Sequence, residues 1–442
     1  MLTGIVMQQY MKPLLALFAG ITLLLLGNGL LNTLVTLAGE ARGFTTSVLG
    51  LLSSGYFLGF FIGIFAVVPV IRRVGHIRTF AFMAALAAVG SLALTLFDNP
   101  WLWLGLRVLY GIALVSLYAV IESWLNAAVT AERRGTVFAL YTMVSLGAIA
   151  ASQQLLRLDS PAAFTLFVLG GILLCLALTP VTLTRLPQPD IMTMPRLDLR
   201  SIWRLAPLAL ITSLFSGLVL GAFWGLMPLY GSLMGLSTGG IGMLMSAAIL
   251  GGAIGQLPIG YYSDRHDRRR VLATVMAAAI VLSALLIPLD ESVFLWGVMA
   301  LWGAMLFALY PIAIAYMVDR VDTGHIVSGS SAALMAFGIG AAIGPAVAGV
   351  LMDILGRDAL PAYFVLCLAI MMTILIIAVR RRSREVPVDE LGHFSPMVRS
   401  TPQVMDMMPD APGDETEAED LPPDDLPPGP DEDSPANPEV RP

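Results

Sequence analysis

Long apolar runs dominate this chain of 442 residues and restrict the structures that it can form. A helix needs about 20 apolar residues to cross the hydrocarbon core of a bilayer. Twelve such runs follow one another between short polar breaks, at residues 13–37, 46–70, 77–97, 101–125, 136–156, 162–182, 204–230, 238–262, 271–289, 293–316, 328–352 and 361–380. The sequence therefore predicts an all-α membrane protein with twelve transmembrane helices. The first run is too long for a signal peptide and no cleavage site follows it, so we expect it to remain as the first helix.

The composition argues against several classes of protein. Only 13% of the residues are charged, whereas soluble proteins have about 25%. The two cysteines and four histidines show no metal-ligand or disulfide spacing, and no phosphate-binding loop or nucleophile motif is present. The basic residues are spread over several loops and form no single patch for nucleic acid. We therefore expect no enzymatic centre, cofactor, metal or nucleic-acid partner.

The distribution of basic residues predicts the orientation in the membrane. The N-terminus, every even-numbered loop and the C-terminus share one side, and this side carries nineteen lysines and arginines. The opposite side carries three, Arg42, Arg157 and Arg357. Because basic loops stay on the cytoplasmic side, both termini are predicted to be cytoplasmic.

An internal repeat divides the chain into two halves. An arginine-rich loop at 72–78 recurs at 264–270, and the same offset of 192 residues carries the first run onto the seventh. Two six-helix repeats around a central path are typical of secondary transporters, whose substrate binds near the midplane between the repeats. The predicted parts are two pseudo-symmetric six-helix bundles at 1–182 and 204–382, a cytoplasmic loop at 183–203 and a tail at 383–442.

The tail has a different composition from the rest of the chain. After Arg384 it contains sixteen acidic residues, two arginines and many prolines. Such a segment cannot bury enough apolar surface to fold, so it is predicted to be disordered and cytoplasmic. It serves either as a solubilising extension or as a docking segment.

A motif follows the eighth run. The stretch Gly260-Tyr-Tyr-Ser-Asp-Arg-His-Asp-Arg-Arg-Arg270 resembles the loop signature of the Major Facilitator Superfamily, Gly-x-x-x-Asp-Arg-x-Gly-Arg-Arg, with Asp267 in place of the inner glycine. An aspartate in a tight turn can cap a helix N-terminus and pair with arginine. We predict a cytoplasmic gate, the alternative being that these charges only retain topology. Its members are Arg72, Arg73, Asp264, Arg265, Arg268 and Arg269.

The fourth run contains two ionisable residues on one helical face. Arg107 and Gly111 resemble the superfamily pattern Arg-x-x-x-Gly, and a mid-bilayer arginine normally faces a polar cavity. We predict that Arg107 orients the substrate, unless it snorkels to the interface. Glu122 is the only acid well inside a run. It is the candidate proton-coupling site, and the alternative is a structural ion pair with Arg72, Arg73 or Arg133.

Polar and aromatic residues in other runs complete the predicted site. Uncharged amides inside a membrane need partners, so they should face the bundle interior. They either hold helices together or bind a polar group of the substrate, whereas the aromatic residues either pack or form a cavity wall. The predicted substrate-binding residues are Asn28, Asn32, Arg107, Gln153, Trp224 and Tyr310.

Further resemblance covers about residues 10–382. The stretches Glu122-Ser-Trp-Leu-Asn126, Tyr310-Pro311 and Val74-Gly-His-Ile-Arg78 are similar to the YcaD-like bacterial branch of the superfamily. This resemblance implies a monomeric, proton- or gradient-driven secondary active transporter of a small molecule in the lipid bilayer of the bacterial inner membrane, working by alternating access.

Two alternatives to this function stay open. In the first-half loop, Val68 replaces the leading glycine of the signature and Arg72 stands where its aspartate belongs. This departure and the long tail fit a non-transporting membrane sensor or scaffold. A drug:proton efflux antiporter is disfavoured because the fifth run lacks the Gly-Pro signature of such antiporters, which appears instead at Gly344-Pro345. No nucleophile–base pair supports an integral membrane enzyme.

Overall fold

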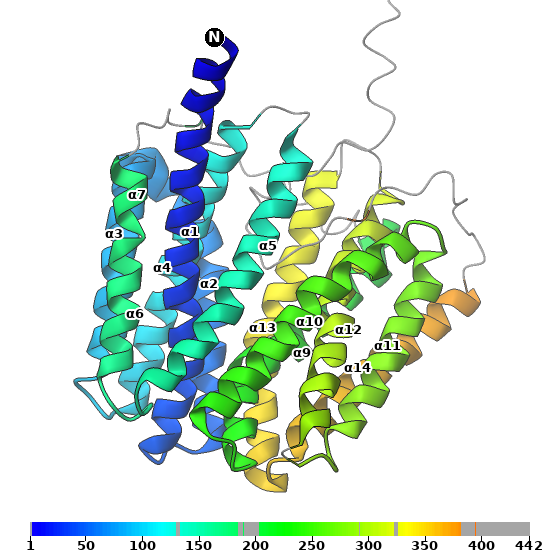
Figure 1. Ribbon diagram of the computed structural model, residues 1–442. Helices are drawn as coiled ribbons and strands as arrows, with labels where there is room; N and C mark the ends of the chain where they lie inside the picture. Colours follow the sequence, from blue (N-terminus) through cyan, green and yellow to red (C-terminus); the bar gives the residue numbers. More distant parts are fainter. Residues whose placement is uncertain are drawn as a thin grey trace, which may run out of the picture. The chain divides into compact units, whose positions relative to one another are not determined.

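The computed structural model is an assembly of α-helices (Figure 1). It describes residues 2–129, 133–183, 189, 203–290, 292–321, 326–381 and 394. The helices are α1 (Leu2–Ala41), α2 (Thr46–Val74), α3 (His76–Ala93), α4 (Pro100–Ala127), α5 (Arg134–Ser152), α6 (Thr165–Leu176), α7 (Leu178–Leu183), α9 (Pro207–Leu233), α10 (Thr238–Ser263), α11 (Arg268–Leu285), α12 (Val293–Val318), α13 (Ile326–Leu355) and α14 (Ala359–Arg381). A 3-10 segment, η2 (Gln153–Leu158), continues α5.

The apolar runs become membrane-length helices, and the expected fold class is confirmed. Eleven helices in the described residues are long and apolar enough to cross a membrane, counting α5 with η2 and α6 with α7 as single spans. The expected run at 271–289 is not among these eleven; it corresponds to α11, whose 18 residues begin with three arginines. The expected linker 183–203 and tail 383–442 lie outside the described residues, apart from Leu183, Pro189, Trp203 and Phe394.

Capping residues set several helix boundaries. Asn99 precedes Pro100, and its side chain accepts hydrogen bonds from the backbone N–H groups of Trp101 and Leu102. This satisfies donors that the first turn of α4 leaves unpaired. Gly43 ends the turn after α1 with φ +77°, a conformation that only glycine adopts without steric cost.

Close approach of helix backbones organises the interior. A Cβ atom on Gly111 of α4 would overlap the carbonyl oxygen of Tyr56 on α2, and one on Gly344 of α13 would overlap that of Leu218 on α9. Small residues at such crossings let membrane helices pack closely. In Figure 1, α1 to α7 lie together and α9 to α14 lie together, and α13 packs along α2.

The helices have two ends that matter for the site. The loops containing Gly43, Asn99 and Gly356 lie at one end, which we call the Gly43 end. The turns after α2 and α10 lie at the other, which we call the Asp264 end. The charge distribution predicts that the Asp264 end is cytoplasmic.

Candidate functional site

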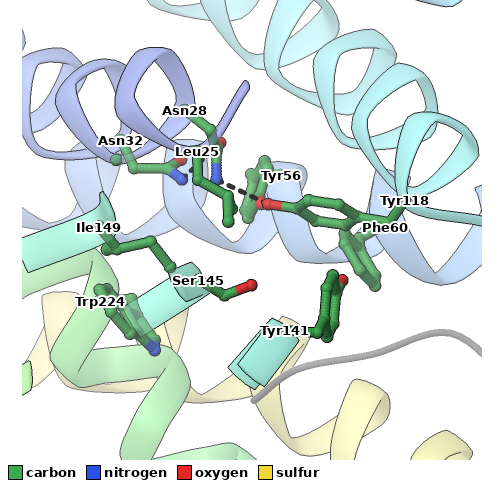
Figure 2. A pocket seen from close by; sticks show the side chains of 11 residues that line it. Leu25, Asn28, Asn32, Tyr56, Phe60, Tyr118, Tyr141, Ser145, Ile149 and Trp224 are labelled. Atoms are coloured by element: carbon green, nitrogen blue, oxygen red, sulfur yellow. Dashed lines mark hydrogen bonds between the residues drawn. The ribbon is translucent and has the colours of Figure 1, made fainter. Parts of the chain in front are cut away.

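A pocket lies among α1, α2, α4, α5 and α9 (Figure 2). None of the eleven lining residues is an Asp, Glu, Lys, Arg or His. They are Leu25, Asn28, Gly29, Asn32, Tyr56, Phe60, Tyr118, Tyr141, Ser145, Ile149 and Trp224.

Two amides from α1 form one wall of the pocket and are held by a chain of hydrogen bonds. Asn32 Nδ2 donates to Asn28 Oδ1 at 2.9 Å, and Asn28 Nδ2 donates to the hydroxyl oxygen of Tyr118 at 3.1 Å. The hydroxyl of Tyr110 also donates to Asn28 Oδ1, at 3.3 Å. Because each amide is already oriented, the wall presents fixed polar groups to a ligand.

Arg107 lies behind this wall and is not part of the pocket lining. Its side chain is buried, and its guanidinium donates to Asn32 Oδ1 at 2.9 Å. The guanidinium carbon also lies 4.6 Å from the ring centre of Tyr56 and 5.6 Å from that of Tyr110, within cation–π range. The buried position agrees with the expected inward-facing arginine and not with snorkelling to the interface.

Glu122 reaches the pocket through a tyrosine. Its side chain is 0% exposed, and the Tyr141 hydroxyl donates to Glu122 Oε1 at 2.7 Å. Tyr141 itself lines the pocket. The arginines considered as ion-pair partners, Arg72, Arg73 and Arg133, have exposed side chains. The structure thus places a buried carboxylate one hydrogen bond away from the pocket surface.

The other predicted substrate residues have different positions. Trp224 lines the pocket from α9. Gln153 is buried beside the pocket, where it accepts a hydrogen bond from Thr33 at 2.7 Å and donates to the carbonyl of Gly29 at 3.1 Å. Tyr310 is absent from the lining, and its ring lies 5.1 Å from that of Phe337. Gln153 and Tyr310 therefore support neighbouring helices.

Sequence reasoning missed several lining residues on α2 and α5. Tyr141, Ser145 and Ile149 follow one another at steps of four, so they share one face of α5. This spacing was available in the sequence, but an aromatic residue in an apolar run looks the same whether it packs or lines a cavity. Tyr56 and Phe60 on α2 have the same ambiguity.

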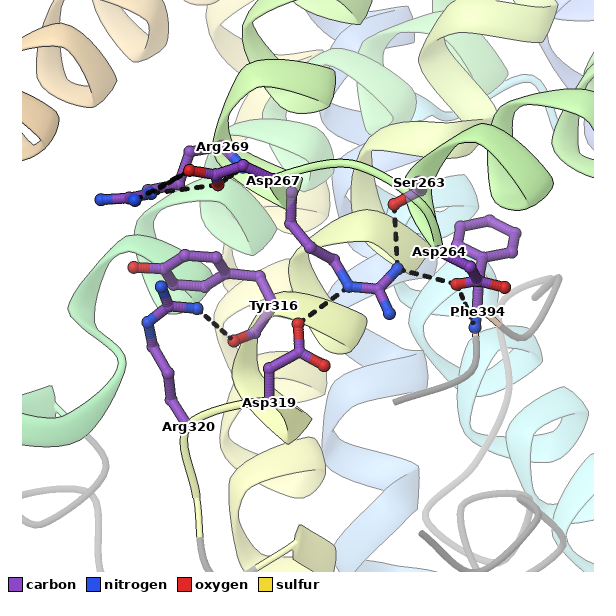
Figure 3. Close-up of polar contacts among 9 residues, drawn as sticks. Ser263, Asp264, Asp267, Arg269, Tyr316, Asp319, Arg320 and Phe394 are labelled. Atoms are coloured by element: carbon purple, nitrogen blue, oxygen red, sulfur yellow. Dashed lines mark hydrogen bonds and ion pairs between the residues drawn. The ribbon is translucent and has the colours of Figure 1, made fainter. Parts of the chain in front are cut away.

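The predicted gate residues at the Asp264 end divide into three groups (Figure 3). Arg268 is buried and donates to Asp319 Oδ2 at 2.9 Å, to Asp264 Oδ1 at 3.1 Å and to the Ser263 hydroxyl at 2.9 Å. Asp264 also accepts a hydrogen bond from the backbone N–H of Phe394 at 2.8 Å. Asp264 therefore pairs within the second half of the chain.

Asp267, which replaces the glycine of the signature, caps α11. Its carboxylate accepts from the backbone N–H of Arg269 at 2.9 Å and pairs with the Arg269 guanidinium at 2.8 Å. Burial acts to raise the pKa of Asp267, but the hydrogen bonds and charge of Arg269 outweigh it and lower this pKa below its ordinary value. The helix cap expected in this loop thus comes from Asp267.

The remaining gate candidates are exposed. Arg265 stacks on Tyr261 of its own turn, with its guanidinium carbon 3.5 Å from the ring centre. Arg72 and Arg73 form the last turn of α2 and extend into solvent. A gating role for any of these residues stays a prediction.

Among the residues that the structure describes, hydrogen bonds between the two halves concentrate toward the Gly43 end. Asp353 of α13 accepts from the backbone N–H groups of Thr46 and Ser47 at 3.0 and 2.9 Å, and so caps α2. Ser232 donates to Glu40 at 2.9 Å. Deeper in the bundle, Thr36 donates to the carbonyl of Gly225, and Gln154 donates to Ser246.

The side chains that the structure describes form no candidate metal site. No group of three or more His, Cys, Asp or Glu residues in that part of the chain could hold a metal ion. The two cysteines are free thiols, Cys175 exposed and Cys367 buried.

Comparison with known proteins identifies the family. The sequence profile of the Major Facilitator Superfamily matches residues 17–323 and 209–404. An MFS-type transporter of Enterobacter sp. (strain 638) is 31% identical over 354 residues, which cover 78% of this chain and 91% of that protein. The MFS-type transporter YcaD of Escherichia fergusonii is 30% identical, with the same coverage.

Solved structures share the fold. The nucleoside transporter NupG has a TM-score of 0.69 at 15% identity, covering 84% of this chain and 98% of its own. A bacterial homologue of the lysosomal transporter Spinster, inward-facing and occupied, has a TM-score of 0.68 at 14% identity, covering 87% and 98%. Together with the pocket between helices of both halves and the confirmed resemblance to YcaD-like proteins, these matches show that the chain belongs to the Major Facilitator Superfamily.

Proposed function

We propose that this secondary transporter moves a small, uncharged molecule that carries hydroxyl groups. The observation that carries the proposal is the pocket lining, in which amides, phenols and one serine hydroxyl surround an uncharged space. Burying a charged ligand there would require an opposite charge at the surface of the pocket. Hydroxyl groups, by contrast, can both donate to and accept from Asn28 and Asn32.

The aromatic residues of the pocket further restrict the chemical class of the proposed substrate. Trp224 supplies a large flat face, and Tyr56 and Phe60 border the same space. A ring with an apolar face and polar edges, as in a sugar or a nucleoside, complements such a wall. The eleven lining residues include no carboxylate to neutralise a lipophilic cation, the expected cargo of a drug:proton antiporter.

The contacts between the two halves support alternating access. Asp353, Glu40 and their partners hold the Gly43 end together. We infer that the pocket in this state is reached from the Asp264 end, and that rocking of residues 1–182 against 204–382 exposes it to the other side. The distribution of basic residues supports a cytoplasmic Asp264 end, cytoplasmic termini and a bacterial inner-membrane location, and the pocket lies within one chain, as a monomer requires.

Glu122 is our candidate for proton coupling. Buried ionisable residues inside membrane helices commonly mark proton pathways. Replacement by glutamine keeps a hydrogen-bond acceptor for Tyr141 but cannot carry a proton. In proteoliposomes, Glu122→Gln should abolish accumulation driven by a pH gradient and leave counterflow intact. Unchanged accumulation would remove Glu122 from the coupling mechanism.

A ligand screen tests the proposed substrate class. The thermal stability of the purified full-length protein should rise with neutral sugars or nucleosides, and not with amino acids, organic acids or lipophilic cations. Trp224→Leu should abolish this shift, whereas Trp203→Leu, an exposed tryptophan outside the pocket, should retain it. Stabilisation by charged compounds alone would refute the proposal.

A counterflow assay distinguishes a transporter from a sensor or scaffold with the same fold. A transporter exchanges the stabilising ligand across a proteoliposome membrane, and removal of residues 385–442 spares this exchange. A sensor or scaffold with the same fold would bind the ligand and show no counterflow.

A further inference from the structure

Tyr141 belongs to two systems at once. Its side chain lines the pocket, and its hydroxyl is 2.7 Å from Glu122 Oε1. The tyrosine is 4% exposed and the glutamate is 0% exposed. Figure 2 shows the Tyr141 and Ser145 hydroxyls among the side chains of the pocket. A change at Glu122 can therefore reach the pocket through a single hydrogen bond.

The direction of this hydrogen bond depends on the charge of Glu122. An ionised carboxylate only accepts hydrogen bonds, and a phenol has one hydrogen to donate. While Glu122 is ionised, the Tyr141 hydrogen is committed to it, and the pocket meets only a lone pair of the phenol oxygen. A protonated Glu122 can donate to that oxygen, which frees the Tyr141 hydrogen to point into the pocket.

Binding and protonation then favour each other. A ligand in the pocket displaces water near Tyr141, and a buried carboxylate without nearby water is costly to keep ionised. A ligand oxygen also gains a donor when Glu122 is protonated. Ligand binding should therefore be accompanied by uptake of a proton.

Other groups near Glu122 come from the elements that pack around it. His76 of α3 contacts the residue after Glu122: its Nε2 is 3.4 Å from the hydroxyl of Ser123. The remaining titratable or charged residues on α1 to α5 whose side chains the structure describes are Glu40, Tyr56, Arg72, Arg73, Arg78, Arg107, Tyr110 and Tyr118. Of this set, Arg72 and Arg73 are exposed to solvent, and Arg107 is hydrogen-bonded to Asn32. For Tyr141 the structure shows both a hydrogen bond to Glu122 and a place in the pocket lining.

We propose that Tyr141 is the positioning residue that couples protonation of Glu122 to ligand binding in the pocket. The proposal rests on the proposed transport function and adds a residue that neither composition nor motif singled out. It predicts that removing one oxygen atom uncouples the two events. Tyr141→Phe keeps the ring and its packing and loses only the hydroxyl.

A ligand-free experiment tests the link to Glu122. Dicyclohexylcarbodiimide enters membranes and modifies protonated carboxyl groups, so labelling of the peptide that contains Glu122 reports its protonation by mass spectrometry. Ionised Glu122 loses a hydrogen bond in Tyr141→Phe, so the pH profile of labelling should move to higher pH. We expect about one pH unit, a tenfold change in labelling at a fixed pH on the steep part of the profile.

Matched variants make this result specific. Tyr56→Phe removes a phenol oxygen from the same pocket and should leave the labelling profile unchanged. Glu122→Gln should lose the label. An unshifted profile in Tyr141→Phe, or an equal shift in Tyr56→Phe, would overturn the proposal. Failure to label the wild-type protein at any pH would also overturn it, since Glu122 would then take up no proton.

Transport assays distinguish the role of Tyr141 in proton coupling from the proposed transport of a neutral ligand. With the neutral ligand that gives the largest stabilisation in the screen, Tyr141→Phe should show weaker counterflow, because a pocket hydroxyl is lost. It should show no accumulation driven by a pH gradient, even at ligand concentrations that saturate this counterflow. Retained accumulation would overturn the role of Tyr141 while leaving the proposed function intact. A screen in which no neutral ligand binds would refute the proposed function and, with it, the coupling to a ligand, even where labelling shows the bond to Glu122.

Discussion

The buried ion pair at the start of α11 offers a quantitative test of the second half of the fold. The side chains of Arg268 and Asp319 are 1% and 0% exposed and lie 2.9 Å apart. Arg268→Met keeps much of the aliphatic volume and removes the charge, so Asp319 loses this partner while it remains buried. Removing one partner of a buried pair typically costs about 3–5 kcal/mol.

The surrounding contacts show where this cost comes from. Arg268 also binds Asp264, whose side chain is 26% exposed. Water can replace the arginine at Asp264, so that contact should contribute less than about 1 kcal/mol. The side chain of Asp319 is 0% exposed, so water does not replace the arginine there. We therefore expect most of the destabilisation of Arg268→Met to come from Asp319.

Equilibrium unfolding in mixed micelles with increasing dodecyl sulfate, followed by tryptophan fluorescence, measures the effect. Arg265→Met is the matched control, because Arg265 lies in the same loop but is exposed, and it should cost at most about 1 kcal/mol. The double variant Arg268→Met with Asp319→Leu should recover most of the loss, because no buried charge remains. The reasoning is refuted if Arg268→Met is no more destabilising than Arg265→Met, or if the double variant is worse than the single one.

Three further predictions follow from helix caps and close contacts. Asp267→Ala should cost about 0.5–2 kcal/mol of folding free energy through loss of the α11 cap. Because the pKa of Asp267 is lowered in the folded protein, this stabilisation is present above the unfolded-state pKa and is lost as the pH falls through the folded-state pKa. The unfolding curves of the variant and the wild type should therefore converge in acid. Gly111→Ala should destabilise the protein by about 1–3 kcal/mol, because the added Cβ overlaps the backbone of α2. Gly105→Ala on the same helix is the control: its added Cβ meets nothing within 4 Å, so it should be neutral or stabilising in the same unfolding assay. Asp353→Ala removes the α2 cap and should weaken closure of the Gly43 end by about 1 kcal/mol. Spin labels on α2 and α13 should then show a several-fold larger population of long distances. An unchanged distance distribution would show that this cap does not hold the two halves together.

Local sequence signals predicted the helices well because their causes are local. Eleven helices in the described residues are long and apolar enough to span a bilayer, and a break such as Asn99-Pro100 contains residues that begin the next helix, here α4. The loop after α10 shows the limit of a motif. The signature suggested that Asp264 caps a helix, but Asp267, which departs from the signature, makes that contact.

The site was predictable only where a residue type leaves little choice. Asn28 and Asn32 had to avoid lipid, and both line the pocket. Gln153 and Tyr310 obey the same rule, but their partners are neighbouring helices. A polar or aromatic residue that faces inward can meet either a cavity or another helix, and the local sequence pattern does not distinguish these two cases.

The sequence by itself determined the helical membrane fold and the superfamily, because these depend on run length and motif. Tertiary packing decided which inward-facing residues surround empty space. It placed α5 so that Tyr141 faces both the pocket and Glu122, and it placed Arg107 behind Asn32, outside the pocket. These relations join residues that are 19 and 75 positions apart. They follow from how close the helices approach and how each is rotated about its axis, which no single run of residues encodes.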